Sequence, residues 1–250
     1  MLRAKNQEDI ARIRASCQIV QAVQVELAAR ICPGVTTADL DRCAEELILS
    51  RGATPAFKGY RGYPATICAS VNAQVVHGIP GPVPLASGDL VSIDVGVCLD
   101  GYFGDGAFTV GVGQVAPEAQ RLIETTRECL DHAIDQARPG NRLSDISHAV
   151  ESHAVREGMS VVRQFGGHGI GQSLHEDPHI NNYGRPGRGP RLRAGYVFAI
   201  EPILSLGSPE ISVRADGWTA VTQDGSPAAH FEHTVAVTDS DPDILTLSTL

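Results

Sequence analysis

The most regular pattern in the chain is the recurrence of apolar residues at helical spacing. This spacing predicts two long helices, over residues 6–30 and 117–137, and two shorter ones, over residues 38–51 and 144–157. Thr37 is expected to cap the first of the shorter helices. A Pro-Gly pair or a single glycine follows each segment as a stop signal. The helices are therefore expected as two pairs, each of one long and one short helix.

Strands are predicted by short apolar runs. Two runs, residues 90–99 and 102–110, flank Asp100-Gly101, which is typical of a type I′ hairpin turn. Residues 54–84 are expected to hold short strands and loops. Further strands are expected over residues 160–164, 195–204, 210–213 and 229–238. Residues 166–190 are dense in Gly, Pro and His and are expected to form a functional loop.

The order of elements repeats within the chain. Pro33-Gly34, a polar cap, a short helix and Gly52 recur 106 residues later, from Pro139-Gly140 to Gly158. This shared register predicts one domain, residues 1–250, built from two related halves of roughly 1–115 and 116–250. We expect a functional site between the halves.

Composition and charge narrow the functional classes. The 250 residues are 42% hydrophobic and 20% charged, which is typical of a soluble globular protein. A net charge of −9 argues against a nucleic-acid-binding protein, because phosphate contacts need clustered Lys and Arg. No signal-like or membrane-spanning apolar run is evident, and the six cysteines form no CxxC pair. We therefore expect a cytoplasmic protein with no membrane partner.

Two carboxylates are expected to meet across the predicted hairpin. If Asp100-Gly101 forms a two-residue turn, Asp105 faces Gly96, which lies on the same side of its strand as Asp94. The carboxylates then become diagonal neighbours. Two ionised carboxylates in a core are unfavourable unless a cation lies between them. A solvent-facing acidic hairpin is the alternative interpretation.

Two further acids and one histidine occupy positions where charge is unexpected. Glu201 directly follows an apolar run, and Glu232 lies inside a strand-like segment. His168 is flanked by glycines, which permit close approach of a ligand. A lone histidine is more often an ordinary buried polar residue, but four acids and one imidazole together suit two divalent cations. The predicted ligands are Asp94, Asp105, His168, Glu201 and Glu232.

Other motifs are weaker. Residues 175–179 match the HExxH zinc-protease pattern, which needs both histidines on one helical turn. Pro178 disfavours a helix there, so we reject that interpretation. His77 is expected to line a pocket and His233 to point away from Glu232. His132, His148 and His153 are expected on helix surfaces.

Six motifs occur together in the order found in the type I methionine aminopeptidases, which this chain resembles from about residue 6 to 237. They are HGIP at 77–80, IDVG and DGYFGD within 93–105, GGHGIG at 166–171, LHEDP at 174–178, IEP at 200–202 and FEHT at 231–234. The resemblance, which is closest to the short bacterial form, implies an α+β class and the pita-bread fold. In that fold, two pairs of helices back a curved antiparallel sheet with pseudo-twofold symmetry.

The resemblance also implies hydrolytic removal of the initiator methionine from nascent polypeptides, with a small second residue preferred. Two divalent ions (Co, Mn, Fe or Zn) would be bridged by Asp105 and Glu232. Asp94 would bind one ion, and His168 with Glu201 the other. The ions lower the pKa of water so that hydroxide attacks the first peptide carbonyl, with Glu201 shuttling the proton.

The resemblance assigns a pocket for the methionine side chain. Its residues are Phe57, Tyr60, Tyr63, Cys68, His77, Leu174 and Trp218. His175 would donate to the developing oxyanion, and His77 would bond near the scissile amide. Family members have a smaller thiol at the position of Phe57 and an aromatic residue at that of Leu174. Methionine is slim and flexible, so a pocket that gains volume at one wall and loses it at another can still accept its side chain.

Two alternatives share the implied fold. An aminopeptidase P or prolidase usually carries an additional N-terminal domain, and little chain precedes His77. A metal-free binding protein would have lost its ligands, and all five are present. The expected partners are the N-terminal methionine of nascent polypeptides and, transiently, the ribosome. Otherwise neither nucleic acid nor membrane is expected, and the protein is expected to be a monomer.

Overall fold

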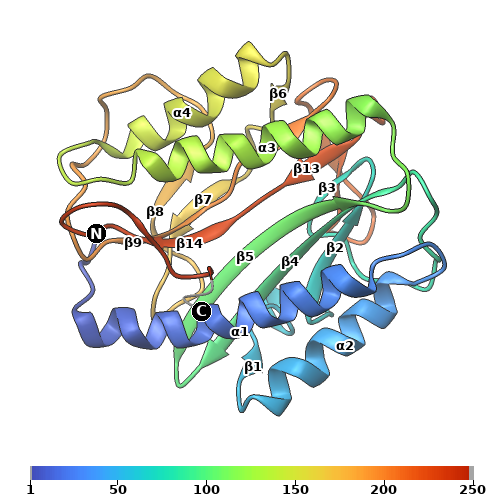
Figure 1. The fold of residues 1–250 in the computed structure, drawn as a ribbon, viewed down its shortest axis with the longest axis horizontal. Helices are drawn as coiled ribbons and strands as arrows, with labels where there is room; N and C mark the ends of the chain where they lie inside the picture. The colour runs from blue at the N-terminus through green and yellow to red at the C-terminus, as the bar shows by residue number, and fades with distance from the viewer. Residues whose placement is uncertain (1, 248–250) are drawn as a thin grey trace.

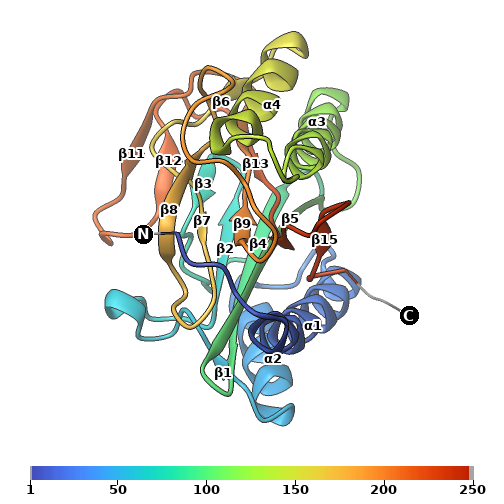
Figure 2. The same cartoon turned by 90° about the vertical axis from the view of Figure 1, so that its left-hand side faces the viewer.

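Two pairs of helices lie on one side of the strands in the structure, a computed structural model that describes residues 2–247 (Figure 1). Helices α1 (Gln7–Arg30) and α2 (Thr37–Ser50) form the lower pair in that view. Helices α3 (Pro117–Asp135) and α4 (Leu143–Arg156) form the upper pair. A view turned by 90° shows both pairs on the same side of the strands (Figure 2). The predicted pairing of long and short helices is therefore confirmed.

Polar caps determine where the lower helices begin. The side chain of Asn6 accepts a hydrogen bond from the backbone of Asp9, whose carboxylate bonds back to the backbone of Asn6. Thr36 and Asp39 form the same reciprocal capping box. The predicted cap at Thr37 is therefore wrong by one residue. The hydroxyl of Thr37 instead accepts a hydrogen bond from the backbone of Gly81.

The predicted hairpin has the register expected from the sequence. Strands β4 (Leu90–Leu99) and β5 (Tyr102–Gly111) are antiparallel, and Gly96 lies opposite Asp105. Asp100 and Gly101 have φ angles of 50° and 77°, as a type I′ turn requires. Asp94 is consequently on the same face of the hairpin as Asp105.

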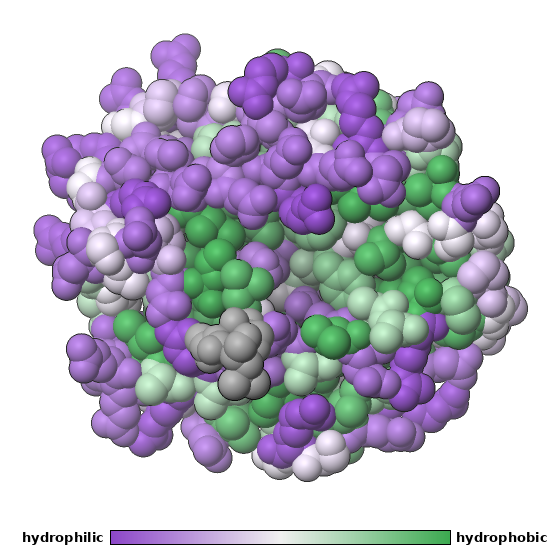
Figure 3. Space-filling view, in the orientation of Figure 1, coloured by the Kyte–Doolittle hydropathy of each residue, from purple (hydrophilic) through white to green (hydrophobic). Residues whose placement is uncertain are grey.

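Alternation along β4 separates the core from the site. Val91, Ile93 and Val95 are fully buried in the apolar cluster beneath α1 and α2. Asp94, between them, is directed to the opposite face. A second apolar cluster packs α3 and α4 mainly against residues between 159 and 237, in the same half of the chain. Hydrophilic side chains cover the upper helices and apolar ones gather between the two helix pairs (Figure 3).

All strand pairings in residues 2–247 are antiparallel. In one sheet, β5 pairs with one edge of β4, and β1 (Thr54–Pro55) and β2 (Ile67–Val71) pair with successive stretches of its other edge. Another has the order β15 (Asp243–Ile244), β14 (His233–Ala236), β9 (Val197–Ile200), β7 (Gly166–Gly169), β8 (Glu176–Asn181). The smaller sheets comprise β3 (Gln74–Val76), β6 (Ser160–Val161), β10 (Ile203–Ser205), β11 (Ile211–Val213), β12 (Ala220–Thr222) and β13 (Ala228–His230).

The prediction of a loop over residues 166–190 is wrong in its first half, because β7 and β8 form there. The glycines of β7 permit close strand contact. A Cβ atom at Gly167 would lie 2.3 Å from the carbonyl oxygen of Ala199, and one at Gly169 would lie 2.2 Å from that of Asp177. Glycine here marks a close approach of two backbones, as it does elsewhere in strands. Because residues 176–181 are a strand, the rejection of a helical HExxH site is confirmed.

Two predicted strands are interrupted in the middle. Residues 195–204 divide into β9 and β10 at Glu201-Pro202, and residues 229–238 divide into β13 and β14 at Phe231-Glu232. The four pieces pair across two sheets, β9 with β14 and β10 with β13. Glu201 and Glu232 therefore lie where the chain passes from one sheet to the other.

The helix histidines differ from one another. His132 is exposed, as predicted. The surface position predicted for His153 is wrong: the residue is only 5% exposed, and Nε2 lies 2.9 Å from a carboxylate oxygen of Glu128. Packing of α3 against α4 buries this ring, which a single-helix pattern could not reveal. His148 is half-buried and contacts the carbonyl oxygen of Gly184. Within residues 2–247, no helix has both the length and the apolar character needed to cross a membrane.

Candidate active site

Acidic and imidazole side chains converge from four separate parts of the chain. Nε2 of His168 on β7 lies 3.9 Å from Oδ2 of Asp105 on β5 and 3.8 Å from Oε1 of Glu201. One ligand atom each from Asp105, His168 and Glu232 lies within 4.8 Å of the other two. Asp94 lines the same cavity. The structure thus brings together all five residues predicted as ligands.

The buried carboxylates lack compensating charge from the protein. Oδ1 of Asp94 and Oε1 of Glu232 are buried without a hydrogen-bond partner. Burial raises the pKa of Asp94 to about 7. Burial, together with the neighbouring acids, raises the pKa of Asp105 and Glu232 well above their ordinary values. Such a cluster favours a bound cation, which would return these groups to their charged forms.

Glu201 has a different environment. Burial alone would raise its pKa, but the imidazoles of His230, His168 and His77 outweigh that effect and lower it. Nε2 of His230 lies 3.6 Å from Oε2 of Glu201 and is buried without a hydrogen-bond partner. Carboxylate oxygens with one imidazole nitrogen are ligands suited to Mn, Fe, Co or Zn.

Backbone contacts hold the ligands in place. Thr234 on β14 accepts a hydrogen bond from the backbone of Asp105 and donates one to its carbonyl oxygen. The backbone of Glu232 pairs with Ala107 on β5. Nδ1 of His168 lies 2.9 Å from the carbonyl oxygen of Gly169, so Nδ1 carries the proton and Nε2 is free to bind a cation.

Two more histidines face the same cavity. His77 has a left-handed backbone with φ of 59°, and burial lowers its pKa. Its ring packs edge-on against Phe165, with centroids 5.1 Å apart. His175 stacks on Tyr60, and its Nδ1 lies 3.0 Å from the tyrosine hydroxyl. Loss of hydration and the adjacent ring of His168 lower the pKa of His175 to about 4, so its ring is neutral at pH 7.

A cavity of about 300 Å³ opens above the carboxylates. Every residue predicted for the pocket lines it: Phe57, Tyr60, Tyr63, Cys68, His77, Leu174, His175 and Trp218. Phe57 is seated against Gly96, where an added Cβ atom would lie 2.4 Å from its ring. Tyr63 packs edge-on against Trp218, with centroids 5.1 Å apart. The bare backbone of Gly96 thus accommodates the larger side chain at position 57.

Several lining residues were not predicted. They are Arg61, Val76, Gln164, Phe165, Gly166, His179 and His230. His230 precedes Glu232 by two positions, so strand alternation was a signal that placed both on one face. Gln164 and Phe165 reach the cavity through the loop between β6 and β7, and no sequence pattern marked them.

Comparisons with known proteins agree over nearly the whole chain. Residues 11–239 match the family model of metallopeptidase family M24. A methionine aminopeptidase of Clostridium perfringens (strain 13 / Type A) is 49% identical over 247 residues, which are 99% of each chain. Methionine aminopeptidase 1 of Bacillus subtilis (strain 168) is 48% identical over 246 residues, which cover 98% of this chain and 99% of that protein.

Solved structures are similar as well. The structure of methionine aminopeptidase from Thermotoga maritima has a TM-score of 0.98 and 42% identity, covering 99% of this chain and 100% of that one. A prolidase from Pyrococcus horikoshii OT3 has a TM-score of 0.79 at 22% identity, and the match covers 98% of this chain but 63% of the prolidase. The second likeness concerns the fold alone.

Proposed function

This chain belongs to metallopeptidase family M24 and, within it, to the methionine aminopeptidases, and we propose how its residues remove methionine from the amino end of peptides. It is a metal-dependent hydrolase with the pita-bread fold, as the resemblance of its motifs implied. Its substrates are peptides and proteins that begin with methionine, and we expect a small second residue.

The convergence of Asp105, His168 and Glu232 is the observation that carries the proposal. These residues lie far apart in the sequence, yet their ligand atoms come within 4.8 Å of one another beside an apolar cavity. The unpartnered oxygens of Asp94 and Glu232 are further ligand atoms with no other role. Asp105 and Glu232 would bridge two divalent ions, with Asp94 on one ion and His168 with Glu201 on the other.

When bound, the ions supply Lewis acidity that lowers the pKa of water and polarises the peptide carbonyl. Glu201 would take up and return the proton, because the surrounding imidazoles hold its carboxylate in the charged form. The hydroxyl of Tyr60 lies 3.0 Å from Nδ1 of His175 and would donate to it, which would leave the Nε2 proton for the developing oxyanion. His77 would bond near the scissile amide.

The cavity explains selection for methionine. Phe57, Leu174 and Tyr63 are buried and provide apolar walls, and Cys68 adds a small thiol. Such a pocket holds an unbranched, flexible side chain and stabilises it by burial of apolar surface. The free amine of the substrate would lie near Asp94, which would restrict cleavage to the first peptide bond.

A metal-dependent assay tests this function. Protein stripped with a chelator should release methionine from Met-Ala-Ser but not leucine from Leu-Ala-Ser once Mn or Co is restored. Asp105→Ala should abolish release and lower the amount of metal bound per chain. Asp100→Asn is the matched control, because it removes a carboxylate from the turn of the same hairpin and retains a residue suited to that turn. Metal bound normally with no release from any peptide would refute the proposed activity.

We further propose a single domain of two halves, roughly residues 1–115 and 116–250, in the cytoplasm and active as a monomer. Each half contributes one helix pair, and the ligands come from both halves. All six cysteines are free thiols, which suits a reducing compartment.

A transient ribosome contact is also proposed. The segment 185–193 carries four arginines and no acid, although the chain as a whole has a charge of −9. Among residues 2–247, no carboxylate pairs with Arg185, Arg188 or Arg193. Such a local patch suits phosphate groups of ribosomal RNA.

A further inference from the structure

Arg61 is the feature of the cavity that the proposed chemistry does not use. It is exposed, and among the described residues that line the cavity it is the one Lys or Arg. Its guanidinium lies over the ring of Tyr60, 5.3 Å from the ring centroid. The same tyrosine ring stacks against His175, and the ring of His175 in turn lies beside that of His168, one of the proposed metal ligands. A positive charge is therefore fixed beside the residue proposed to face the scissile carbonyl.

A tight turn holds Arg61 in this position. Its backbone is left-handed, with φ of 48° and ψ of 24°, between Gly59 and Gly62, which also have positive φ. The backbone N–H of Gly59 donates to the carbonyl oxygen of Tyr63, and the N–H groups of Gly62 and Tyr63 donate to the carbonyl oxygens of Gly59 and Tyr60. Tyr63 is buried, and its hydroxyl lies 2.9 Å from the carbonyl oxygen of Gly78. Residues other than glycine seldom adopt this conformation, and here it places the side chain of Arg61 at the cavity.

The charge of Arg61 is not used inside the protein. No carboxylate in residues 2–247 forms an ion pair with it. The acids of the cavity serve the proposed metal ions on its floor. A neighbouring groove of about 410 Å³ shares His175 with the cavity, but there Lys5 pairs with Glu176 at 2.5 Å and Arg3 lies near Asp9. Arg61 therefore carries a positive charge without a carboxylate partner at the opening of the cavity, where a bound substrate would extend outward.

We propose that Arg61 is a specificity-determining residue that favours substrates with an acidic side chain at the third or fourth residue, counting the initiator methionine as the first. This inference rests on the proposed function. The methionine side chain and the amine occupy the cavity, and the second residue must be small to pass the histidines. The residues that follow would be the first with room for a charged side chain, and they would pass Arg61 and His175, which line the cavity and are exposed.

The expected preference is modest, because an exposed ion pair is screened by water and salt. For wild-type protein, kcat/KM should be about threefold to tenfold higher for an acidic peptide than for its lysine counterpart, since attraction and repulsion both contribute. The peptides are Met-Ala-X-Ser-Ser and Met-Ala-Ser-X-Ser, with X as Asp, Ser or Lys. The preference should fall when salt is raised from low to molar concentration.

Variants of Arg61 provide the direct test. Arg61→Gln should bring the acidic-to-lysine ratio close to one, Arg61→Glu should invert it, and Arg61→Lys should retain most of it. Arg61→Asn should change the acidic-to-lysine ratio as Arg61→Gln does, and asparagine tolerates the left-handed backbone at this position. Arg127→Gln is the matched control, because Arg127 is exposed on α3 and does not line the cavity. If Arg61 only covered the ring of Tyr60, its variants would change kcat/KM by the same factor for all peptides, and Arg61→Glu would not invert the ratio.

The outcomes separate this inference from the proposed function. If wild type releases methionine from every peptide and the charge variants leave the acidic-to-lysine ratio unchanged, Arg61 does not read substrate charge, although the proposed activity stands. If wild type with restored metal releases methionine from none of the peptides, including the serine ones, the proposed function fails and this inference fails with it.

Discussion

At the scale of single residues, the site depends on charges placed where the surrounding sequence is apolar. Glu201 directly follows β9 and Glu232 directly precedes β14, so each interrupts a strand predicted from the sequence. Asp105 is only 3% exposed and has acidic neighbours. Unfavourable positions of this kind persist when a ligand compensates for them, which is why buried acids indicated a cation site from the sequence.

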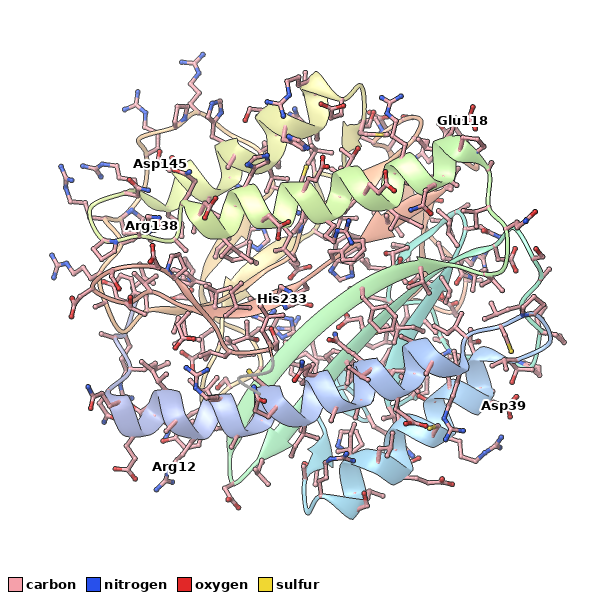
Figure 4. The ribbon with its side chains drawn as sticks, in the orientation of Figure 1. Arg12, Asp39, Glu118, Arg138, Asp145 and His233 are labelled. Carbon is pink, nitrogen blue, oxygen red and sulfur yellow. The ribbon has the colours of Figure 1, made fainter. Side chains whose placement is uncertain are left out.

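His233 permits a residue-scale prediction about pH. It lies on β14 between the two helix pairs (Figure 4), and its Nδ1 is 2.8 Å from the hydroxyl of Thr246. Burial lowers its pKa from 6.5 to about 4. Because the folded value is the lower one, its contribution to stability is complete above pH 6.5 and is lost as the pH falls toward 4. The loss should amount to about 2 kcal/mol for this half-buried ring.

His233→Asn keeps a polar group near Thr246 and removes the titrating ring. In urea unfolding with chelator present, its stability should fall less steeply than that of wild type between pH 6.5 and 4. His132→Asn, at an exposed ring, should follow the wild-type curve. Parallel curves for wild type and His233→Asn would contradict the assigned origin of the shift.

At the scale of elements, two devices position the ligands. The hairpin β4–β5 places Asp94 and Asp105 on one face through a two-residue turn and strict alternation. Strand β7 brings His168 close to β9 because its glycines leave room for neighbouring backbone. The first device follows from local sequence rules. The second depends on which strands become neighbours, and glycine richness alone indicated a loop.

Gly167→Ala tests the second device. The new methyl group would lie 2.3 Å from the carbonyl oxygen of Ala199, so β7 must move away from β9 and carry His168 with it. We expect a loss of about 3 kcal/mol in the free energy of unfolding, measured by denaturant titration, and weaker metal binding. Gly81→Ala is the control, since no atom lies within 4 Å of its added Cβ atom. Equal stability of the two variants would show that β7 can shift without cost.

At the scale of the whole molecule, the site forms where segments from both ends of the sequence meet. The backbone of Glu232 bonds to Ala107, and Thr234 bonds to Asp105, so the C-terminal strands close over the N-terminal hairpin. The long connection between β8 and β9 is held at the surface by the loop between α3 and α4. Arg142 donates to the carbonyl oxygen of Gly189, and Arg191 donates to that of Gly140.

The arginines of that connection carry a whole-molecule prediction. They lie near the end of the upper helix pair marked by Arg138 and Asp145 (Figure 4). Replacing Arg185, Arg188 and Arg193 together with Gln should weaken co-sedimentation with ribosomes at low salt. Each lost phosphate contact should also lower the slope of log affinity against log salt by about one. The triple variant of Arg51, Arg127 and Arg214, all exposed elsewhere, should bind as wild type does. Equal binding by both triple variants would refute the ribosome contact proposed for this segment.

The sequence by itself determined the helix pairs, the hairpin register and the identity of the five ligand candidates, because each depends on local periodicity, turn chemistry or a charge out of place. The resemblance of the motifs added the pocket residues that the cavity contains. Only the tertiary structure decided that β7 is a strand, that His230 approaches Glu201, that His153 is buried and that Arg61 stands unpaired at the mouth. These features arise from contacts between segments distant in sequence, which no local pattern encodes.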